Sequence, residues 1–204
     1  INTPEVAEQV LASGQADMVS MARPFLADPE FVNKAAAGKA DRINTCIACN
    51  QACLDHTFQL QLTSCLVNPR ACHETVLTIE PTTTPRRIAV VGSGPGGLAA
   101  AVTAAERGHD VTLFEADDQI GGQFNYAAQI PGKEEFHETM RYFRNALVDA
   151  GVTVRLGIRA GAEDLTDFDE VVLATGVAPR IPDIPGIDHP EVLTYLQVLR
   201  DHVE

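Results

Sequence analysis

Three cysteines occur within eight positions of the stretch TCIACNQACLD, residues 45–55. Cys46, Cys49 and Cys53 are followed by Cys65, so that the spacing is C-x2-C-x3-C-x11-C. Each iron of a [4Fe–4S] cube takes one thiolate, and a compact loop can supply three of them while a more distant residue supplies the fourth. Structural zinc sites instead use two separated pairs of ligands. The spacing therefore favours a [4Fe–4S] cluster, with a zinc site and unligated thiols as the alternatives.

The fifth cysteine, Cys72, lies outside this set, and we interpret it as a packing residue beside the cluster. The cysteines are odd in number and clustered, whereas those of a disulfide framework are spread along the chain. Thiols kept reduced for a metal are typical of cytosolic proteins, so we predict a cytoplasmic location. None of the six histidines is spaced from another as metal ligands are, so we expect no histidine ligand.

A second group of residues suited to chemistry is the glycine-rich loop GSGPGG, residues 92–97. It has the G-x-G-x-x-G pattern and stands between an expected strand and an expected helix. Gly92 allows the tight turn, Gly94 lets the backbone approach a pyrophosphate, and Gly97 lets the helix pack closely. The helix directs its positive N-terminal end at the phosphates. The predicted nucleotide contacts in this loop are Gly92, Ser93, Gly94, Pro95 and Gly97.

Residues after the loop specify the nucleotide further. Glu115 follows Gly97 by 18 positions, where a carboxylate accepts hydrogen bonds from ribose hydroxyls. Because a carboxylate repels a 2′-phosphate, we do not expect this site to bind NADP. The glycine pair in IGGQ, residues 120–123, and the run VVLATG, residues 171–176, are both typical of flavoproteins with two dinucleotide sites. They favour FAD over NAD, and a glycine turn without a nucleotide is the alternative.

An α/β framework is needed to bring these residues together. After residue 86 the order of the expected elements is β-α-β, a connection, α-β and β, which is typical of a dinucleotide-binding fold. A stretch rich in proline and threonine, residues 78–87, looks like a linker before it. The expected strands are 87–91, 109–116, 152–156 and 169–176, and the expected helices are 98–108 and 134–151.

The first forty residues predict a helix, a strand and a second helix. Thr3 caps the first helix, which Gly14 ends. Residues 16–21, ADMVSM, are the expected strand. The second helix covers residues 31–37 and ends at Gly38.

Composition limits the classes of function. The chain has 204 residues, 45% of them hydrophobic, which is enough for one large or two modest domains with cores. Its net charge of −13 argues against a nucleic-acid partner, because a nucleic-acid site must neutralise phosphates. No apolar run approaches the roughly 20 residues that span a bilayer, so we expect no membrane partner either. The chain starts at Ile1, and we expect it to be an internal piece of a longer polypeptide.

Taken in order, these motifs make the sequence resemble the 2,4-dienoyl-CoA reductases of the bacterial NADPH-dependent iron–sulfur flavoenzyme type. Trimethylamine dehydrogenase and histamine dehydrogenase are similar in architecture. The resemblance covers essentially all of the chain. Its most specific stretches are MARPFLADP (21–29), CIACNQACLD (46–55), SCLVNPRACHET (64–75), IGGQFNYAAQIPGKEEF (120–136) and GIDHPEVLTYLQVLRD (186–201).

The resemblance implies an α/β protein made of several parts. Residues 1–43 would be the C-terminal end of an FMN-binding TIM barrel of the old yellow enzyme type. Residues 44–77 would bind the [4Fe–4S] cluster, and residues 78–85 would be the linker. Residues 86–204 would form an incomplete FAD-binding, Rossmann-like domain, with the NAD(P) domain missing.

The resemblance also suggests further cofactor contacts. Ala22 and Arg23 would contact FMN, with Arg23 at the phosphate, because barrel phosphate sites are built by the loops after the last strands. The alternative is that Arg23 is a surface residue. The remaining FAD contacts would be Gly122, Gln123, Lys133, Ala160 and Gly176, although Lys133 could equally be a solvated loop charge.

The activity implied by the resemblance is reduction of a C=C bond in an unsaturated acyl-CoA, a reaction of fatty acid β-oxidation. Electrons would pass from NADPH to FAD, through the cluster to FMN, and then to the substrate. A hydride donor moves two electrons and the cube moves one, so flavins are needed on both sides. No catalytic residue is expected in this chain, because the substrate pocket would lie in the missing barrel, and we expect the isolated chain to be inactive.

Two other functions are the alternatives. One is an amine dehydrogenase of the same architecture, with FAD or only ADP at the nucleotide site and no use of NADPH. The other is a non-catalytic, zinc-stapled nucleotide-binding module. IPGKEEF, residues 130–136, and the IGGQ pair favour the reductase. The sequence indicates no oligomeric state.

Overall fold

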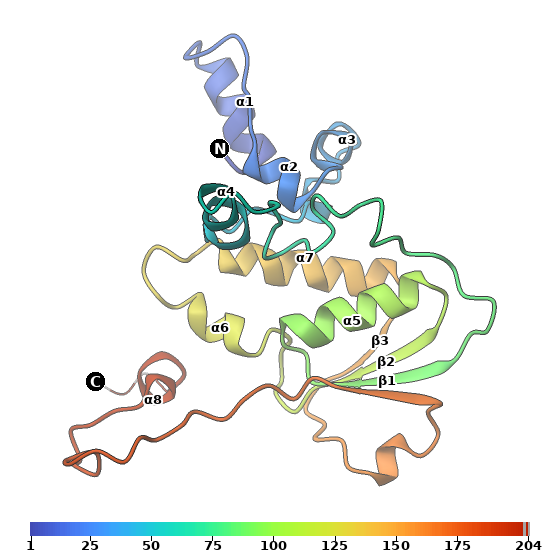
Figure 1. The fold of residues 1–204 in the computed structure, drawn as a ribbon, viewed down its shortest axis with the longest axis vertical. Helices are drawn as coiled ribbons and strands as arrows, with labels where there is room; N and C mark the ends of the chain where they lie inside the picture. Colours follow the sequence, from blue (N-terminus) through green and yellow to red (C-terminus); the bar gives the residue numbers. More distant parts are fainter. Residues whose placement is uncertain (202, 204) are drawn as a thin grey trace.

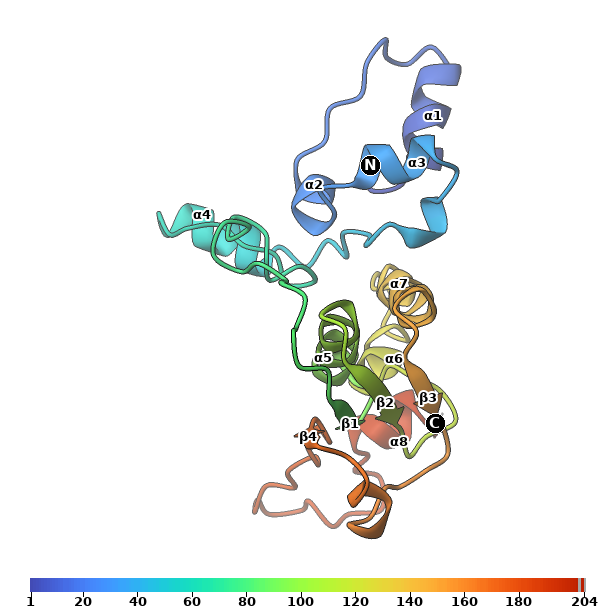
Figure 2. The ribbon, with the colours of Figure 1, turned by 90° about the vertical axis from the view of Figure 1, so that its right-hand side faces the viewer.

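The computed structural model describes residues 1–201 and 203. A parallel four-stranded sheet with helices on one face forms the lower part of Figure 1, and three short N-terminal helices lie at the opposite end of the molecule. The cysteine segment, residues 44–77, lies between these two parts (Figure 2). The α/β class predicted from the sequence is confirmed. The predicted FAD domain runs to residue 204, and residues 202 and 204 lie outside the described residues.

The sheet has the strand order β3-β2-β1-β4, with all strands parallel. Val90 of β1 pairs with Leu113 of β2 on one side and with Val172 of β4 on the other. Each of the four expected strands is present, although each except β1 is shorter than predicted. The strands are β1 (Arg87–Val91), β2 (Asp110–Phe114), β3 (Thr153–Arg155) and β4 (Glu170–Leu173).

Two helices cover one face of this sheet. Helix α5 (Pro95–Glu106) starts at a proline, which suits a first helical turn, and it is therefore three residues longer at its start than predicted. Helix α7 (Phe136–Asp149) buries Met140, Phe143 and Leu147, spaced as one face of a helix requires. These side chains pack with the apolar residues of β1, β2 and α5 in one core. Each such side chain contributes about 2 kcal/mol to folding when fully buried.

Smaller elements connect and flank this core. The sequence did not predict the short helices α6 and α8, because each has only about one turn and so shows no periodicity. Thr194 and Gln197 form a capping box at the start of α8. These elements are α6 (Gln123–Ala127), η3 (Glu163–Leu165) and α8 (Tyr195–Leu199).

The N-terminal region confirms two predicted helices. Helix α1 (Pro4–Ala12) is capped by the hydroxyl of Thr3, which accepts from the backbone N–H of Val6, and the chain turns at Gly14. Helix α3 (Phe31–Ala36) is one residue shorter than expected. A further helix, α2 (Arg23–Ala27), was not predicted.

The strand predicted over residues 16–21 is wrong. These residues are all described and have no regular structure, and Met18 is 79% exposed. A strand is stable only when neighbouring strands satisfy its backbone groups. Among the described residues, all strands belong to the nucleotide-fold sheet. The apolar pattern of ADMVSM thus has no partner strand here.

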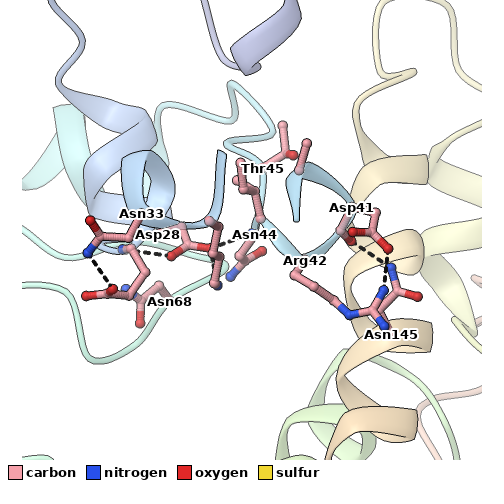
Figure 3. A network of polar contacts seen from close by, with 12 residues as sticks. Asp28, Asn33, Asp41, Arg42, Asn44, Thr45, Asn68 and Asn145 are labelled. Carbon is pink, nitrogen blue, oxygen red and sulfur yellow. Dashed lines mark hydrogen bonds and ion pairs between the residues drawn. The ribbon is translucent and has the colours of Figure 1, made fainter. Parts of the chain in front are cut away.

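Asp28 ties the N-terminal region to the cysteine segment. Its carboxylate accepts from the Lys34 ammonium at 2.6 Å and from the backbone N–H of Asn44 at 2.8 Å. Asn68 donates to the carbonyl of Leu26 at 2.8 Å. Figure 3 shows Asp28, Asn44 and Asn68 grouped in this network. The network holds the two ends of the cysteine segment against the same short helix.

The cysteine segment itself has little regular structure. The 3-10 turn η1 (Ala40–Arg42) precedes it, and it contains the π-helical turn η2 (Gln51–Asp55) and the single turn α4 (His56–Phe58). Ala48 and Asn50 adopt left-handed backbone conformations, which is uncommon outside glycine. Within residues 1–201 and 203, no helix has both the length and the apolar character needed to span a bilayer.

Candidate functional site

A cavity of about 530 Å³ lies at the carboxyl ends of β1, β2 and β4 and at the N-terminus of α5. This is where open parallel sheets bind their ligands. Most of the predicted nucleotide contacts line it together. These are Gly92, Ser93, Gly94, Pro95, Glu115, Gly122, Gln123, Ala160 and Gly176.

Glycine is required at positions 92 and 97 of the loop for different structural reasons. Gly92 has φ +102°, and a Cβ there would overlap the carbonyl oxygen of Ala174 on the neighbouring strand's extension. A Cβ on Gly97 would overlap the carbonyl oxygen of Gly92. Gly97 is buried and does not line the cavity, so its role is the close packing of α5 against the loop.

Gly94 differs from these two residues. A Cβ built on it meets no protein atom within 4 Å, because it would project into open space beside the cavity. The second glycine pair lies against it, since a Cβ on Gly122 would be 3.2 Å from the Cα of Gly94. The two glycine-rich turns, 28 positions apart, therefore meet at one wall of the cavity. Here the backbone can approach a bound phosphate closely.

Glu115 is buried at the cavity, with 9% of its surface exposed. One carboxylate oxygen accepts from the backbone N–H of Ser93 at 2.7 Å and from its hydroxyl at 2.6 Å. The other accepts from the backbone N–H of Asp117 at 3.0 Å. Burial opposes ionisation, but these hydrogen bonds outweigh it and lower the pKa of Glu115. The sequence predicted a ribose contact and missed this bond between the ends of β1 and β2.

The lowered pKa of Glu115 predicts a pH dependence of stability. A carboxylate with a lowered folded-state pKa stabilises the fold above its ordinary value of 4.5, and this contribution is lost as the pH falls through the folded-state pKa. At pH 7 we expect Glu115→Gln to lower the free energy of unfolding by about 2 kcal/mol, typical of a hydrogen bond to a charged group. The difference from wild type should shrink as the pH falls below 4.5.

Thermal unfolding of both proteins between pH 7 and pH 3 would test this prediction. Glu163→Gln is a suitable control, because Glu163 is exposed and its side chain accepts no hydrogen bond from the described residues. A constant difference between wild type and Glu115→Gln over this pH range would show that the Glu115 charge does not stabilise the fold.

Some cavity residues were not predicted. Tyr126, Ile158, Arg159 and Val177 also line the space. Arg159 directly precedes Ala160, and no motif separates it from an ordinary loop arginine. Gln123, which was predicted, has its side-chain oxygen hydrogen-bonded to the hydroxyl of Tyr195 in α8 at 3.2 Å.

Like Gly97, Lys133 is a predicted FAD contact that does not line the cavity. It is exposed in the turn before α7, and its ammonium lies 5.7 Å from the centre of the Phe136 ring. This position agrees with the alternative considered from the sequence, in which Lys133 is a solvated charge in a loop. The motif PGKEEF thus forms the turn into α7 and does not line the cavity.

The four cysteines that the spacing grouped together line one narrow cavity of about 10 Å³. Each of Cys46, Cys49, Cys53 and Cys65 is partly buried. In the part of the chain that the structure describes, no three Cys, His, Asp or Glu side chains converge as ligands of a single metal ion. Four thiols around one cavity fit the ligand number of a [4Fe–4S] cluster, although the loop has to widen to take a cube.

Backbone groups also surround Cys65. Burial raises the pKa of its thiol, and the nearby Cys46 and Cys49 raise it further, while hydrogen bonds from the backbone at Val67 and Asn68 lower it. Hydrogen bonds to cluster sulfurs are one of the means by which proteins set cluster potentials. Burial has the largest effect and leaves the pKa of Cys65 raised, while the two backbone donors are placed where a bound cluster sulfur would accept from them.

Arg23 also lines the cysteine cavity, and its guanidinium donates to the side-chain oxygen of Asn50. Ala22, at the start of α2, is exposed. The contact with FMN predicted for both residues stays a prediction. An arginine has five donors, so the donors of Arg23 that do not bond Asn50 are available to a phosphate.

The interpretation of Cys72 as a packing residue is wrong. Cys72 is exposed and has φ +62°. Its backbone N–H donates to the carboxylate of Glu74, and it does not line the cysteine cavity. The turn that carries it faces solvent, which a cysteine pattern alone does not reveal.

Comparison with known proteins gives the family. Residues 86–203 match the model described as pyridine nucleotide-disulphide oxidoreductase. The chain belongs to the pyridine nucleotide-disulphide oxidoreductase family. Residues 1–42 match the NADH:flavin oxidoreductase / NADH oxidase family. This combination confirms the predicted membership among flavin oxidoreductases of the 2,4-dienoyl-CoA reductase and old yellow enzyme type.

Three relatives of this flavin oxidoreductase chain illustrate the likeness. A metal reductase of Desulforamulus reducens is 43% identical over 98% of this chain and 31% of its own length. The structure of 2-naphthoyl-CoA reductase with 2-naphthoyl-CoA has a TM-score of 0.94 and 37% identity, covering 100% of this chain and 31% of that one. The 6-hydroxypseudooxynicotine amine oxidase of Pseudomonas geniculata N1 has a TM-score of 0.88 and 31% identity, covering 100% of this chain and 33% of that one. The chain thus spans about a third of the length of these relatives.

Proposed function

We propose that this chain is the cluster-binding and FAD-binding section of an NADPH-dependent flavin and iron–sulfur oxidoreductase that reduces C=C bonds of unsaturated acyl-CoA. The observation that carries the proposal is the pairing of two sites in one chain. A four-cysteine cavity lies between residues 1–42, which match the NADH:flavin oxidoreductase family, and a cavity lined by the glycine-rich loop. The likeness to 2-naphthoyl-CoA reductase supports a thioester substrate.

Each site has a defined task in this proposal. Cys46, Cys49, Cys53 and Cys65 would hold a [4Fe–4S] cluster, which supplies one-electron transfer between two flavins. At the larger cavity, the N-terminus of α5 would face the FAD pyrophosphate, and Glu115 would accept from the ribose while anchored by Ser93. A carboxylate accepts several hydrogen bonds at once, so both tasks are compatible. Ala22 and Arg23 would contact FMN, and the protein would be cytoplasmic.

An amine dehydrogenase is the second candidate function. The specific observation in its favour is the likeness to the 6-hydroxypseudooxynicotine amine oxidase over the whole chain. A zinc-stapled module is the third. The four thiols that line this cavity come as three closely spaced cysteines and one distant cysteine, which suits a cluster with four corners better than the paired ligands of a structural zinc.

Oxidation of NADPH by the full-length protein separates the first two functions. We expect the rate to rise at least tenfold on addition of a 2,4-dienoyl-CoA or 2-enoyl-CoA, a gain that corresponds to about 1.4 kcal/mol of barrier. Secondary and tertiary amines should reduce neither flavin. Anaerobic flavin reduction by an amine, with no oxidation of NADPH, would overturn the reductase assignment in favour of the amine dehydrogenase.

A further inference from the structure

A single arginine of the α/β part that follows residue 86, called the nucleotide-binding part below, contacts the start of the cysteine segment. Arg141 lies on α7, and its guanidinium donates to the backbone carbonyls of Asp41 and Ile43, the latter at 2.9 Å. It also donates to the hydroxyl of Thr45 at 3.1 Å. The carboxylate of Glu138, one turn earlier on α7, accepts from its Nε at 2.7 Å and so fixes the direction of the guanidinium.

The acceptors of Arg141 need such a donor. Asp41 and Ile43 lie in and just after the 3-10 turn η1, and the last carbonyls of a helical turn have no partner within it. Ile43 and Thr45 are buried, at 1% and 2% exposure, so their polar groups are largely shielded from water. A guanidinium, with five donors in a fixed fork, can satisfy several of these groups at once.

Other contacts join the same two parts, but they involve residues 41 and 42 and do not reach residues 43–45. Asn145 donates to the carbonyl of Asp41 at 2.6 Å, and Arg42 pairs with Asp149 at 2.7 Å. Figure 3 shows Asn145 and Asp41 side by side at this joint. Within residues 1–201 and 203, the hydrogen bonds that run from α7 to residues 43–45 are those of Arg141.

We propose that Arg141 is the positioning residue that fixes the entry of the cysteine loop against the nucleotide-binding part. Thr45 directly precedes Cys46, the first expected cluster ligand, so the Arg141 contacts set where the loop begins relative to α7. Helix α7 packs in the core that also supports the nucleotide loop through α5. The position of residues 43–45 relative to α7 therefore depends on this residue. The inference about the cluster rests on the proposed function, whereas the inference about the loop does not.

The experiment compares Arg141→Ala, Arg141→Lys and Arg144→Ala in the full-length protein. Arg144 is the matched control, because it lies on the same helix, is exposed and makes no hydrogen bond or ion pair within the described residues. The first readout is hydrogen exchange of the backbone amides of residues 43–50. The second is the rate of iron release to a chelator, and the third is the flavin content.

For Arg141→Ala we expect amide exchange over residues 43–50 to accelerate at least tenfold, which corresponds to about 1.4 kcal/mol of local opening. Iron release should accelerate by a similar factor, while flavin content stays at the level of Arg144→Ala. Arg141→Lys keeps the charge with fewer donors, and we expect an intermediate effect. It also keeps the test valid if the alanine variant fails to fold.

Amide exchange in Arg141→Lys and Arg141→Ala equal to that of Arg144→Ala would overturn the proposal. Equal acceleration throughout the chain would overturn it as well, because that result shows general destabilisation and no local role. If the wild-type protein holds no iron, the proposed function fails on that ground. The amide exchange then still decides the role of Arg141.

Discussion

Replacing Cys49 by serine is expected to leave the full-length protein folded but with less than about a tenth of its iron and acid-labile sulfide, since each iron of the cube depends on its own thiolate. Cys49 lies in the middle of the three-cysteine loop and lines the cavity with the other three thiols. A hydroxyl is a far poorer ligand for iron than a thiolate. Iron and sulfide analysis after anaerobic purification measures the effect, and Cys46, Cys53 and Cys65 should behave in the same way.

Cys72→Ser is the matched control for these variants. Cys72 is exposed and outside the cysteine cavity, so its replacement should leave iron and sulfide at wild-type values. Loss of the cluster in Cys72→Ser with retention in Cys49→Ser would mean that the ligand set was chosen wrongly. The pair of variants therefore tests the assignment residue by residue.

The second large effect is expected in the glycine-rich loop, where substitution of one glycine should lower stability and substitution of another should weaken FAD binding. Gly97→Ala should lower the free energy of unfolding by about 3 kcal/mol or more, because its Cβ overlaps the backbone of Gly92 and neither can move freely. Gly94→Ala should change stability by less than about 0.5 kcal/mol, since no protein atom lies near its Cβ. It should instead weaken FAD binding at least tenfold, about 1.4 kcal/mol, by keeping the pyrophosphate from the backbone.

Two measurements separate these effects. Denaturant unfolding reports on Gly97→Ala, and FAD titration of the deflavinated protein reports on Gly94→Ala. Gly161→Ala is the control for both, because Gly161 has no positive φ and lies outside the cavity with space for a Cβ. Wild-type FAD affinity in Gly94→Ala would exclude close contact between this turn and the phosphates.

The parts of the fold that could be predicted from the sequence are those with strong local signals. Strand β1, helix α5 and helix α7 follow from an apolar run, an alanine-rich run closed by a glycine, and a helical apolar face. The grouping of four cysteines followed from their spacing alone. The cavity around Gly92 and Glu115 followed because a strand, a glycine loop and a helix have one common arrangement in parallel α/β folds.

Other features depend on contacts between distant residues and carry no local signal. The apolar run at residues 16–21 reads as a strand, but its structure is decided by partner strands that the described chain does not provide. The bond between Glu115 and Ser93 depends on two strand ends meeting across the sheet. Arg141 is one of several charged residues on α7, and its partners at residues 41–45 and its pairing with Glu138 set it apart from Arg144.

Metal, sulfide and flavin analysis of the anaerobically purified full-length protein tests the central claim most directly, together with electron paramagnetic resonance after reduction. The account predicts iron and acid-labile sulfide in equal amounts, a reduced-cluster signal, and both FAD and FMN in the extract. Zinc without acid-labile sulfide, held by the same four cysteines, would contradict a one-electron relay at Cys46, Cys49, Cys53 and Cys65.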